Sequence, residues 1–454
     1  MTKDIIIIGA GLTGLTTAFY AKRRGKDLLV LDRLPFTGGQ MRSHPVGDFI
    51  FEGGPSTGSI SYPEVAELFD DLSGEVEMDI ARPSSKCRLI WKGDRFHPMP
   101  SGLASAIATP LYSLQDKVRI LGEPWRKKGT DPDETVGMMT IRRLGRSFLD
   151  YAVDPFINGV YAGDPMQLPT RLALPKLYRL EQNHGSFIRG SIALAKRKKT
   201  EREKKATKQI FSAKGGFGQL TAALTRKIGE DHIALNVKEV RIQPSSDGTY
   251  TVTYQDGNGT PQTVTARKVV TTCGSYCLPD LLPFLPKEQV DRLNNLLYAP
   301  VIEIGVGIKD VHGHHYPAFG GLVPSKEKKD VLGILFPSAC FEGRAPEEGA
   351  TLAYFLGGIR HPEMMQKTDA ELTEIVMTTL HSLLKYPEEI TPDEIRIFRH
   401  PHAIPQYQLS TDDRYQAIEE VQRQYPGLII AGNIRDGIGM ADRIRQAVGI
   451  AQAL

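Results

Sequence analysis

The sequence predicts an α/β fold in which a discontinuous Rossmann-like nucleotide-binding domain is joined to an α+β domain and a mainly helical insert. Residues 4–32 follow the pattern strand, glycine turn, helix and strand, which is one βαβ unit. A second strand, glycine turn and helix close the chain at 428–453. Because both ends carry patterns typical of a nucleotide site, we expect them to meet in one domain.

The periodicity of the intervening chain divides the protein into three parts. The nucleotide-binding domain is predicted to comprise 1–80, 209–290 and 390–454, and an α+β domain that binds substrate is predicted to comprise 81–102 and 291–389. The helical insert is predicted over 103–208, with a loop rich in Pro and Gly at the DPFINGVYAGDP stretch.

Composition narrows the class of protein further. The 454 residues carry a net charge of only +3, so no basic excess indicates binding to nucleic acid. The four cysteines have no regular spacing, which favours a reducing cytoplasm over a disulfide scaffold or a zinc module. No apolar run is long enough to span a bilayer, and we expect no signal peptide, so membrane contact would have to be peripheral.

The first motif is a glycine-rich turn after the first strand. Gly9, Gly11 and Gly14 form a GxGxxG pattern, and Asp32 ends the next strand. In such a motif the glycines permit a tight turn, close approach of a pyrophosphate and close packing of the helix, while the acid accepts ribose hydroxyls. This pattern predicts a dinucleotide site and is compatible with either FAD or NAD.

The second motif favours FAD. Gly39 and Arg42 lie in GGQMRS, and Gly54 lies in the FEGGP segment that follows. Closely spaced glycines after the second strand allow the chain to lie along an extended cofactor. A nicotinamide enzyme would normally continue directly into another helix.

The third motif lies near the end of the chain. Gly432 and Asn433 follow an apolar strand, and Gly439 and Met440 begin a predicted helix. The start of this helix would direct backbone N–H groups and a positive dipole at a ligand. With an isoalloxazine ring there, they would stabilise negative charge on the reduced flavin.

Together these blocks resemble the FAD-binding architecture of amine oxidases, phytoene desaturases and protoporphyrinogen oxidases. The stretch 151–165, YAVDPFINGVYAGDP, closely resembles a segment of the protoporphyrinogen/coproporphyrinogen oxidase family, and KGGFGQL at 214–220 and AIPQYQL at 403–409 are also similar. The resemblance runs in collinear order from Asp4 to Leu454. One departure is Met440-Ala441-Asp442, where members often carry Pro before the Asp.

The resemblance implies one non-covalently bound FAD per chain and assigns further site residues. Arg42 matches an arginine near the flavin, and Val240 matches a position whose backbone meets the adenine. Arg88 matches an arginine that pairs with a substrate propionate, which suits the planar fork of a guanidinium. Gly159 and Gly163 match the wall of the substrate cavity. No metal site and no dedicated catalytic base are expected.

The activity implied is oxidation of a porphyrinogen, a tetrapyrrole, to the porphyrin of haem synthesis, with hydride transfer to flavin N5. Such a protein mainly orients the macrocycle, since the cofactor supplies the difficult chemistry. The alternatives are a carotenoid desaturase or amine oxidase on the same scaffold, or a non-catalytic porphyrin-binding flavoprotein. The choice between proto- and coproporphyrinogen, the electron acceptor (dioxygen or another) and the oligomeric state stay open.

Two features of the insert bear on membrane contact. The basic run from Lys196 to Lys208 would be attracted to an anionic leaflet, although such runs are most often solvated. An apolar patch of the insert is predicted from Leu103, Ile107, Leu111, Tyr112 and Leu114.

Overall fold

The computed structural model describes residues 2–454, apart from the side chain of Leu103, and contains two large sheets. The first has the order β10-β2-β1-β13-β12-β11, with β19 paired to β13. Its strands are β1 (Lys3–Ile8), β2 (Leu28–Leu31), β10 (Ile233–Ala234), β11 (Lys238–Pro244), β12 (Tyr250–Gln255), β13 (Pro261–Thr271) and β19 (Leu428–Ile430). Strands β1, β2, β10 and β19 run parallel to their partners, so segments from both ends of the chain share this sheet.

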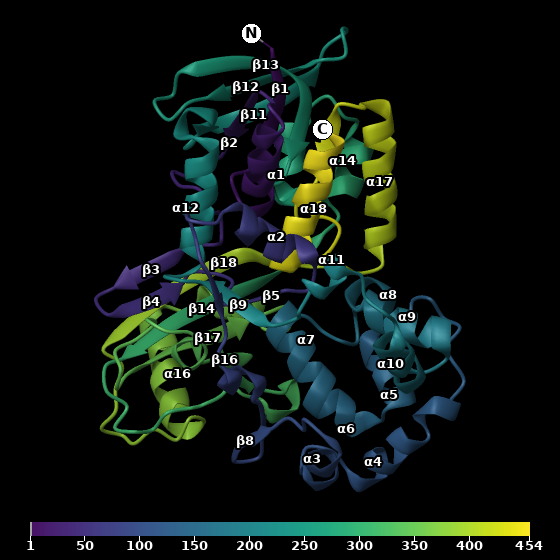
Figure 1. The fold of residues 1–454 in the computed structure, drawn as a ribbon, viewed down its shortest axis with the longest axis vertical. Helices are drawn as coiled ribbons and strands as arrows, with labels where there is room; N and C mark the ends of the chain where they lie inside the picture. The colour runs from purple at the N-terminus through teal and green to yellow at the C-terminus, as the bar shows by residue number, and fades with distance from the viewer. Residues whose placement is uncertain (1) are drawn as a thin grey trace.

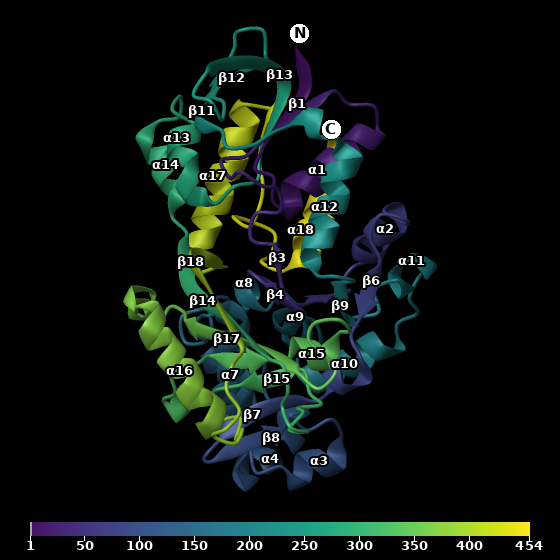
Figure 2. The same ribbon diagram turned by 90° about the vertical axis from the view of Figure 1, so that its left-hand side faces the viewer.

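Helices cover both faces of the first sheet (Figure 2). One face packs on α1 (Leu12–Arg23), α2 (Pro63–Asp71), α12 (Phe217–Ile228) and α18 (Met440–Ala453). The other packs on α13 (Leu278–Leu281), α14 (Lys287–Asn294) and α17 (Ser410–Gln424). Alternate residues of β1 explain this arrangement, since Ile5 and Ile7 are buried in one core and Ile6 and Ile8 in the other.

The second sheet has the order β18-β14-β17-β16-β15-β7-β8 and lies below the first in Figure 1. Its strands are β7 (Arg88–Lys92), β8 (Arg95–Pro98), β14 (Leu297–Ile308), β15 (Gly320–Leu322), β16 (Gly333–Leu335), β17 (Ala350–Gly357) and β18 (Glu394–Gln406). One face packs on α16 (Asp369–Ser382), with α15 (Pro337–Cys340) beside β17. Strand β18 pairs with β14 here, although the sequence assigned 390–454 to the nucleotide-binding domain. An alternating pattern identifies a strand but not the sheet that it joins.

Two small sheets connect the large ones. They consist of β3 (Ser43–Val46) with β4 (Phe49–Glu52), and of β5 (Gly58–Ser59) and β6 (Met78–Ile80) on either side of β9 (Ile210–Ala213). Gly305 and Gly307 of β14 leave room for the rings of Phe51 and Phe49, since a Cβ at either glycine would lie within 3 Å of a ring carbon. The segment after the nucleotide βαβ unit is thereby packed against the second sheet.

The insert is helical as predicted. It contains α3 (Leu103–Ala108), α4 (Leu114–Leu121), α5 (Val136–Arg143), α6 (Arg146–Phe148), α7 (Asp154–Tyr161), α8 (Thr170–Ala173), α9 (Pro175–His184), α10 (Phe187–Lys196) and α11 (Glu201–Lys204). The prediction of a loop at DPFINGVYAGDP is wrong for residues 154–161, because they form α7. Pro155 occupies the first turn, where a proline is tolerated, and the helix ends at Ala162 with a φ of 48°.

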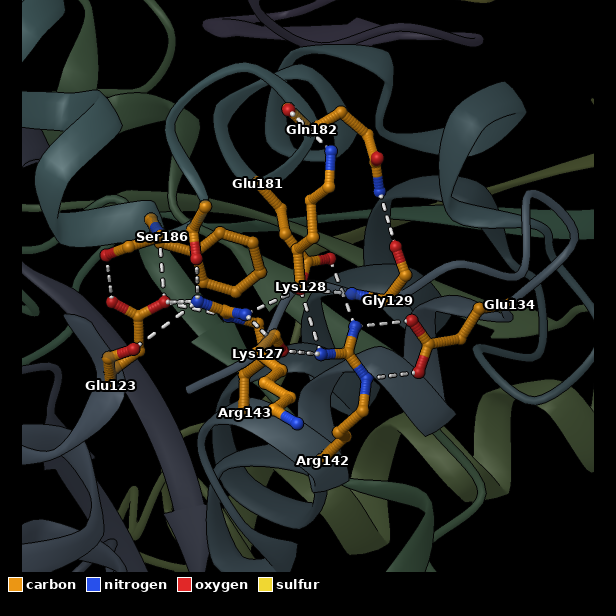
Figure 3. A network of polar contacts seen from close by, with 12 residues as sticks. Glu123, Lys127, Lys128, Gly129, Glu134, Arg142, Arg143, Glu181, Gln182 and Ser186 are labelled. Atoms are coloured by element: carbon orange, nitrogen blue, oxygen red, sulfur yellow. Dashed lines mark hydrogen bonds and ion pairs between the residues drawn. The ribbon is translucent and has the colours of Figure 1, made fainter. Parts of the chain in front are cut away.

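A buried ion cluster holds the insert together (Figure 3). Arg143 is fully buried and donates to Glu123 at 2.8 Å and to Glu181 at 2.6 Å, while Arg142 bridges Glu134 and Glu181. Burial alone would raise the pKa of Glu123, but hydrogen bonds from Ser186, the Phe187 N–H and Arg143 outweigh it and lower that pKa. The cluster therefore joins α5, α9 and the start of α10 through charged side chains that all have partners.

Candidate active site

A large cavity lies between the two sheets and the insert. Its volume is about 2450 Å³, well above the roughly 300–1,000 Å³ of an ordinary ligand pocket, so it has room for a dinucleotide and a second large ligand. The predicted residues that line it are Gly9, Gly11, Asp32, Gly39, Arg42, Gly54, Gly159, Val240, Asn433, Gly439 and Met440. Gly14, Gly432, Gly163 and Arg88 do not line it.

The glycines of the first motif divide into two roles. A Cβ at Gly14 would lie 1.8 Å from the carbonyl oxygen of Gly9, so this glycine permits close packing of α1 against the turn. A Cβ at Gly11 would meet no atom within 4 Å and would project into the cavity. The first turn of α1 contains no acidic residue and no side chain caps its start, which leaves its N–H groups available to phosphates.

Asp32 lies at the end of β2 beside this turn. Its Oδ2 accepts the Ala10 N–H at 2.6 Å and its Oδ1 accepts the Leu34 N–H at 2.8 Å. Burial raises the pKa of Asp32, and these two backbone hydrogen bonds oppose that effect. Each carboxylate oxygen retains a lone pair for a ribose hydroxyl, so the side chain is both a brace for the glycine turn and a candidate ligand.

Val240 lies at an irregularity in β11. The register with β12 shifts between Lys238 and Arg241, and Glu239 has a φ of 52°. A bulge leaves backbone groups outside the regular ladder of hydrogen bonds. The backbone of Val240 is therefore free to meet a ring at the cavity wall, which suits the adenine position assigned to it.

The second motif runs alongside the first. Gly38 forms a bridge to Gly11 and its N–H donates to the Ala10 carbonyl at 2.8 Å. Arg42 stacks on Phe36, with its guanidinium carbon 3.6 Å from the ring centre. A Cβ at Gly54 would lie 2.2 Å from the carbonyl oxygen of Gln40. These contacts keep the chain flat along the cavity, as an extended cofactor requires.

The third motif begins α18 at the cavity wall. Gly432 is a structural position, because it has a φ of 89° and a Cβ there would lie 2.7 Å from the Thr272 carbonyl oxygen. Tyr407 donates to the Asn433 carbonyl at 2.8 Å. Asp442 accepts the Gly439 N–H at 3.1 Å and so caps the start of α18. The positive end of the α18 dipole, which we expected to face the ligand, therefore has an acid beside it.

The family-specific stretch reaches the cavity through the end of α7. Val160, Tyr161 and Ala162 line the cavity together with Gly159. A Cβ at Gly159 would lie 2.4 Å from Leu322 Cδ2 of β15, so α7 packs closely on the second sheet there. Gly163 is buried behind the wall, where a Cβ would lie 2.5 Å from Gln406 Oε1.

Arg88 lies at the start of β7, exposed and away from the cavity. Its guanidinium carbon is 5.5 Å from the ring centre of Phe319. The cavity instead carries exposed cations on α9 and α18 that have no ion-pair partner in residues 2–454 as described. They are Lys176, Arg179 and Arg445. Sequence reasoning missed them because isolated basic residues on helices are ordinarily solvated.

The wall opposite the nucleotide motifs is formed by the second sheet. It carries the apolar side chains of Val301, Leu332, Phe355 and Phe398, and among its polar residues are Glu303, His400 and, also on β18, Arg399 and His402. A lone acid in the apolar run VIEIGVGI was a visible signal for Glu303. The strand pattern did not predict that this face would line the cavity.

These observations fit FAD as the cofactor. The adenosine part would lie by Asp32 and Val240, the pyrophosphate at Gly11 and the start of α1, and the flavin among Arg42, Gly54 and Met440. Within the described residues no group of three or more His, Cys, Asp or Glu is placed to hold a metal ion.

Comparison with known proteins gives consistent results. The family model described as flavin containing amine oxidoreductase matches residues 12–454. The chain is 29% identical to protoporphyrinogen oxidase 2 of Arabidopsis thaliana, over 97% of this chain and 92% of that protein. It is 24% identical to coproporphyrinogen III oxidase of Bacillus subtilis, over 98% and 96%. A solved structure from Exiguobacterium sp. 255-15 has the same fold, with a TM-score of 0.82, 22% identity and coverage of 100% and 98%.

Proposed function

This chain belongs to the family of flavin containing amine oxidoreductases, and from that premise we propose that it oxidises a porphyrinogen, protoporphyrinogen IX or coproporphyrinogen III, with bound FAD. The observation that carries the proposal is the cavity of about 2450 Å³, which continues from the nucleotide motifs to the wall of the second sheet and the end of α7. Relatives of nearly equal length bear the names of porphyrinogen oxidases.

The chemistry supplied by bound FAD is acceptance of a hydride. The protein's own residues bind and orient the substrate. Phe355 and Phe398 offer flat apolar surfaces to a macrocycle, and Val160 and Ala162 border the same space. The protein contributes to the rate by holding the reacting carbon close to the cofactor and by excluding water.

The cations at the rim support a substrate with carboxylate side chains. Lys176 and Arg445 both lie over the ring of Tyr62, at 4.9 and 3.9 Å from its centre, and Arg179 is on the same helix as Lys176. Because they have no ion-pair partner in the described chain, they are available to propionates. Polyenes have no such groups, which disfavours a carotenoid desaturase.

The test is anaerobic mixing of the purified protein with proto- and coproporphyrinogen while the visible flavin absorbance is followed. We expect bleaching by at least one porphyrinogen and none by benzylamine or a carotenoid. Bleaching by an amine alone would contradict the proposal in favour of an amine oxidase. Bound flavin that none of these compounds reduces would indicate a carrier.

We also propose that the insert contacts a membrane surface through its outer helices. Leu114, Val118 and Leu121 are exposed on one face of α4, and Trp125 and Ile107 are exposed nearby. No helix among the described residues is long and apolar enough to cross a bilayer. A patch of this kind, with Lys117 beside it, suits the interface of an anionic leaflet.

The structure differs from the sequence expectation both in the apolar patch and in the basic run. Leu111 and Tyr112 are buried, and the side chain of Leu103 lies outside the description. The basic run at 196–208 is tied to α2, because Arg202 pairs with Glu64 and Glu67, and Lys205 pairs with Asp70.

The test is cosedimentation with vesicles containing phosphatidylserine. Binding should fall in the double variant Leu114→Glu/Leu121→Glu. It should persist in the control variant Leu409→Glu, because Leu409 is an exposed apolar residue elsewhere.

A further inference from the structure

Glu303 is an acid set in an apolar wall. It lies in the middle of β14, directly opposite Phe355 of β17 and Phe398 of β18. Directly opposite residues of antiparallel strands share one face of the sheet, so the carboxyl lies between two phenyl rings. Glu303 is 2% exposed and yet lines the cavity. Its side chain therefore reaches the cavity wall but not bulk water.

The hydrogen bonding of Glu303 is incomplete. Oε1 accepts from the Ser56 hydroxyl at 2.9 Å, and no group in residues 2–454 as described bonds Oε2. Neighbouring Glu52 differs, since it accepts from Arg344, Ser43 and the Phe217 N–H. A buried polar atom ordinarily has a partner. Glu303 thus has an unused hydrogen-bonding position where a ligand would meet the wall.

Burial disfavours the charged form of the Glu303 carboxyl. It raises the pKa of Glu303 well above its ordinary value, and the charge of Glu52 raises it further, while the hydrogen bond from Ser56 acts in the opposite direction. Arg344, the cation in this network, bonds Glu52 and not Glu303. A neutral carboxyl can donate and accept hydrogen bonds but would not hold an ammonium group strongly.

His400 is a second polar group on the same face. It lies opposite Val301 in the β14–β18 register, which makes it a diagonal neighbour of Glu303. Its Nε2 is buried without a hydrogen-bond partner among the described residues. Burial lowers the pKa of His400, and the backbone of Gly53 opposes this effect. In the neutral tautomer with the proton on Nδ1, Nε2 is an acceptor.

We propose that Glu303 and His400 bind the pyrrole N–H groups of the substrate macrocycle, an inference that rests on the proposed oxidation of a porphyrinogen. Pyrrole N–H groups are neutral donors on a flat ring. They match neutral acceptors placed beside the faces of Phe355 and Phe398. Oxidation removes protons from pyrrole nitrogens, so the product has fewer donors for this wall and is bound less tightly than the substrate.

The test compares Glu303→Gln, Glu303→Leu and His400→Phe as full-length FAD-loaded proteins. The readouts are the porphyrinogen concentration for half-maximal anaerobic flavin reduction, the limiting rate and the resting flavin spectrum. We expect Glu303→Leu and His400→Phe each to raise the half-saturating concentration about tenfold, the usual scale for one lost hydrogen bond. Glu303→Gln keeps a carbonyl acceptor and should stay within about threefold of the unaltered protein.

Thr351→Val is the matched control, because Thr351 is a buried residue of β17 with an unpartnered hydroxyl that does not line the cavity. It should leave both kinetic quantities unchanged. If Glu303→Leu does not fold, Glu303→Gln and His400→Phe still decide the matter. If no porphyrinogen reduces the flavin of the unaltered protein, the proposed function itself is wrong, whatever the variants do.

Three results would overturn this inference while the proposed function stands. One is a half-saturating concentration unaffected by Glu303→Leu and His400→Phe. Another is a loss in Glu303→Gln as large as in Glu303→Leu, which would mean that an ionised carboxylate is needed. The third is an altered flavin spectrum or FAD content in the resting variants, which would assign Glu303 to the cofactor.

Discussion

The guanidinium of Arg360 donates from Nη1 to Asp154 Oδ1 at 2.6 Å and so ties the end of β17 to the first residue of α7. Its Nη2 donates to Asp164 at 2.7 Å, beyond the other end of that helix. One side chain from the turn after β17 therefore holds both ends of the segment that brings Gly159 to Ala162 to the cavity.

Replacing Arg360 by Met should loosen this segment without disturbing the nucleotide site. We expect a stability loss of about 1.5–3 kcal/mol, the usual scale for hydrogen bonds to charged groups, and a lower kcat/KM with unchanged FAD content. Urea unfolding and anaerobic flavin reduction measure the two effects. Full activity in the variant would show that the position of α7 does not depend on Arg360.

Substitution of Gly11 and substitution of Gly14 should have different effects, on FAD binding and on folding respectively. Gly11 has extended backbone and open space around a Cβ, so Gly11→Val should fold but be colourless, because valine would occupy the path of the pyrophosphate. Gly14→Val should not fold, because its Cβ would overlap the Gly9 carbonyl oxygen. Thermal melting and FAD released on denaturation distinguish them. Normal FAD content in folded Gly11→Val would remove Gly11 from the site.

Loss of Arg143 should destabilise the whole insert. Arg143→Met leaves Glu123 and Glu181 buried with one fewer cation, which commonly costs about 3–5 kcal/mol. The control is Arg226→Met, since Arg226 forms an exposed, solvent-screened pair with Glu75 that contributes little to stability. Equal unfolding midpoints in urea for the two variants would contradict a structural role for the cluster.

The parts of this protein that the sequence predicted are those where one short segment determines the geometry. The GxGxxG turn, the acid after β2 and the closing strand and helix depend on local backbone, and their residues line the cavity except where a glycine serves close packing. The hairpin of β7 and β8, with its turn at Gly93 and Asp94, likewise depends on local backbone.

What the sequence did not predict depends on contacts between distant segments. Glu303 acquires its environment from β17, β18 and the loop at Ser56, and a single strand pattern carries no information about that packing. The same holds for Asp154 and Arg360, which are separated by 206 positions. Arg88 resembled a family position, but the register of β7 leaves it outside the cavity lining.

Mild acid should loosen the insert. The pKa values of Glu123 and Glu181 lie below the ordinary value of 4.5, because hydrogen bonds from Ser186 and Arg142, among others, outweigh the effect of burial. A carboxyl with a lowered pKa stabilises the fold above its unfolded value, and this contribution is lost as pH falls through the folded pKa. Proteolysis of the insert should therefore increase below about pH 4.5, and a flat profile would contradict this.

The binding of substrate carboxylates distinguishes Arg88 from the cations at the rim. If propionates bind at Lys176, Arg179 and Arg445, the double change Lys176→Gln/Arg179→Gln should raise KM for porphyrinogens by about one to two decades, since a hydrogen bond to a charged group is worth about 1.5–3 kcal/mol. FAD content should stay normal, because neither residue belongs to the nucleotide motifs. Arg88→Ala should then leave kcat/KM unchanged. Steady-state kinetics with both porphyrinogens on the same preparations provide the comparison. The substrate with more propionates should lose more affinity in the double variant.

The reverse outcome would be an unaffected double variant together with a raised KM in Arg88→Ala. It would restore the family-based role of Arg88, and it would require β7 to approach the cavity when substrate binds.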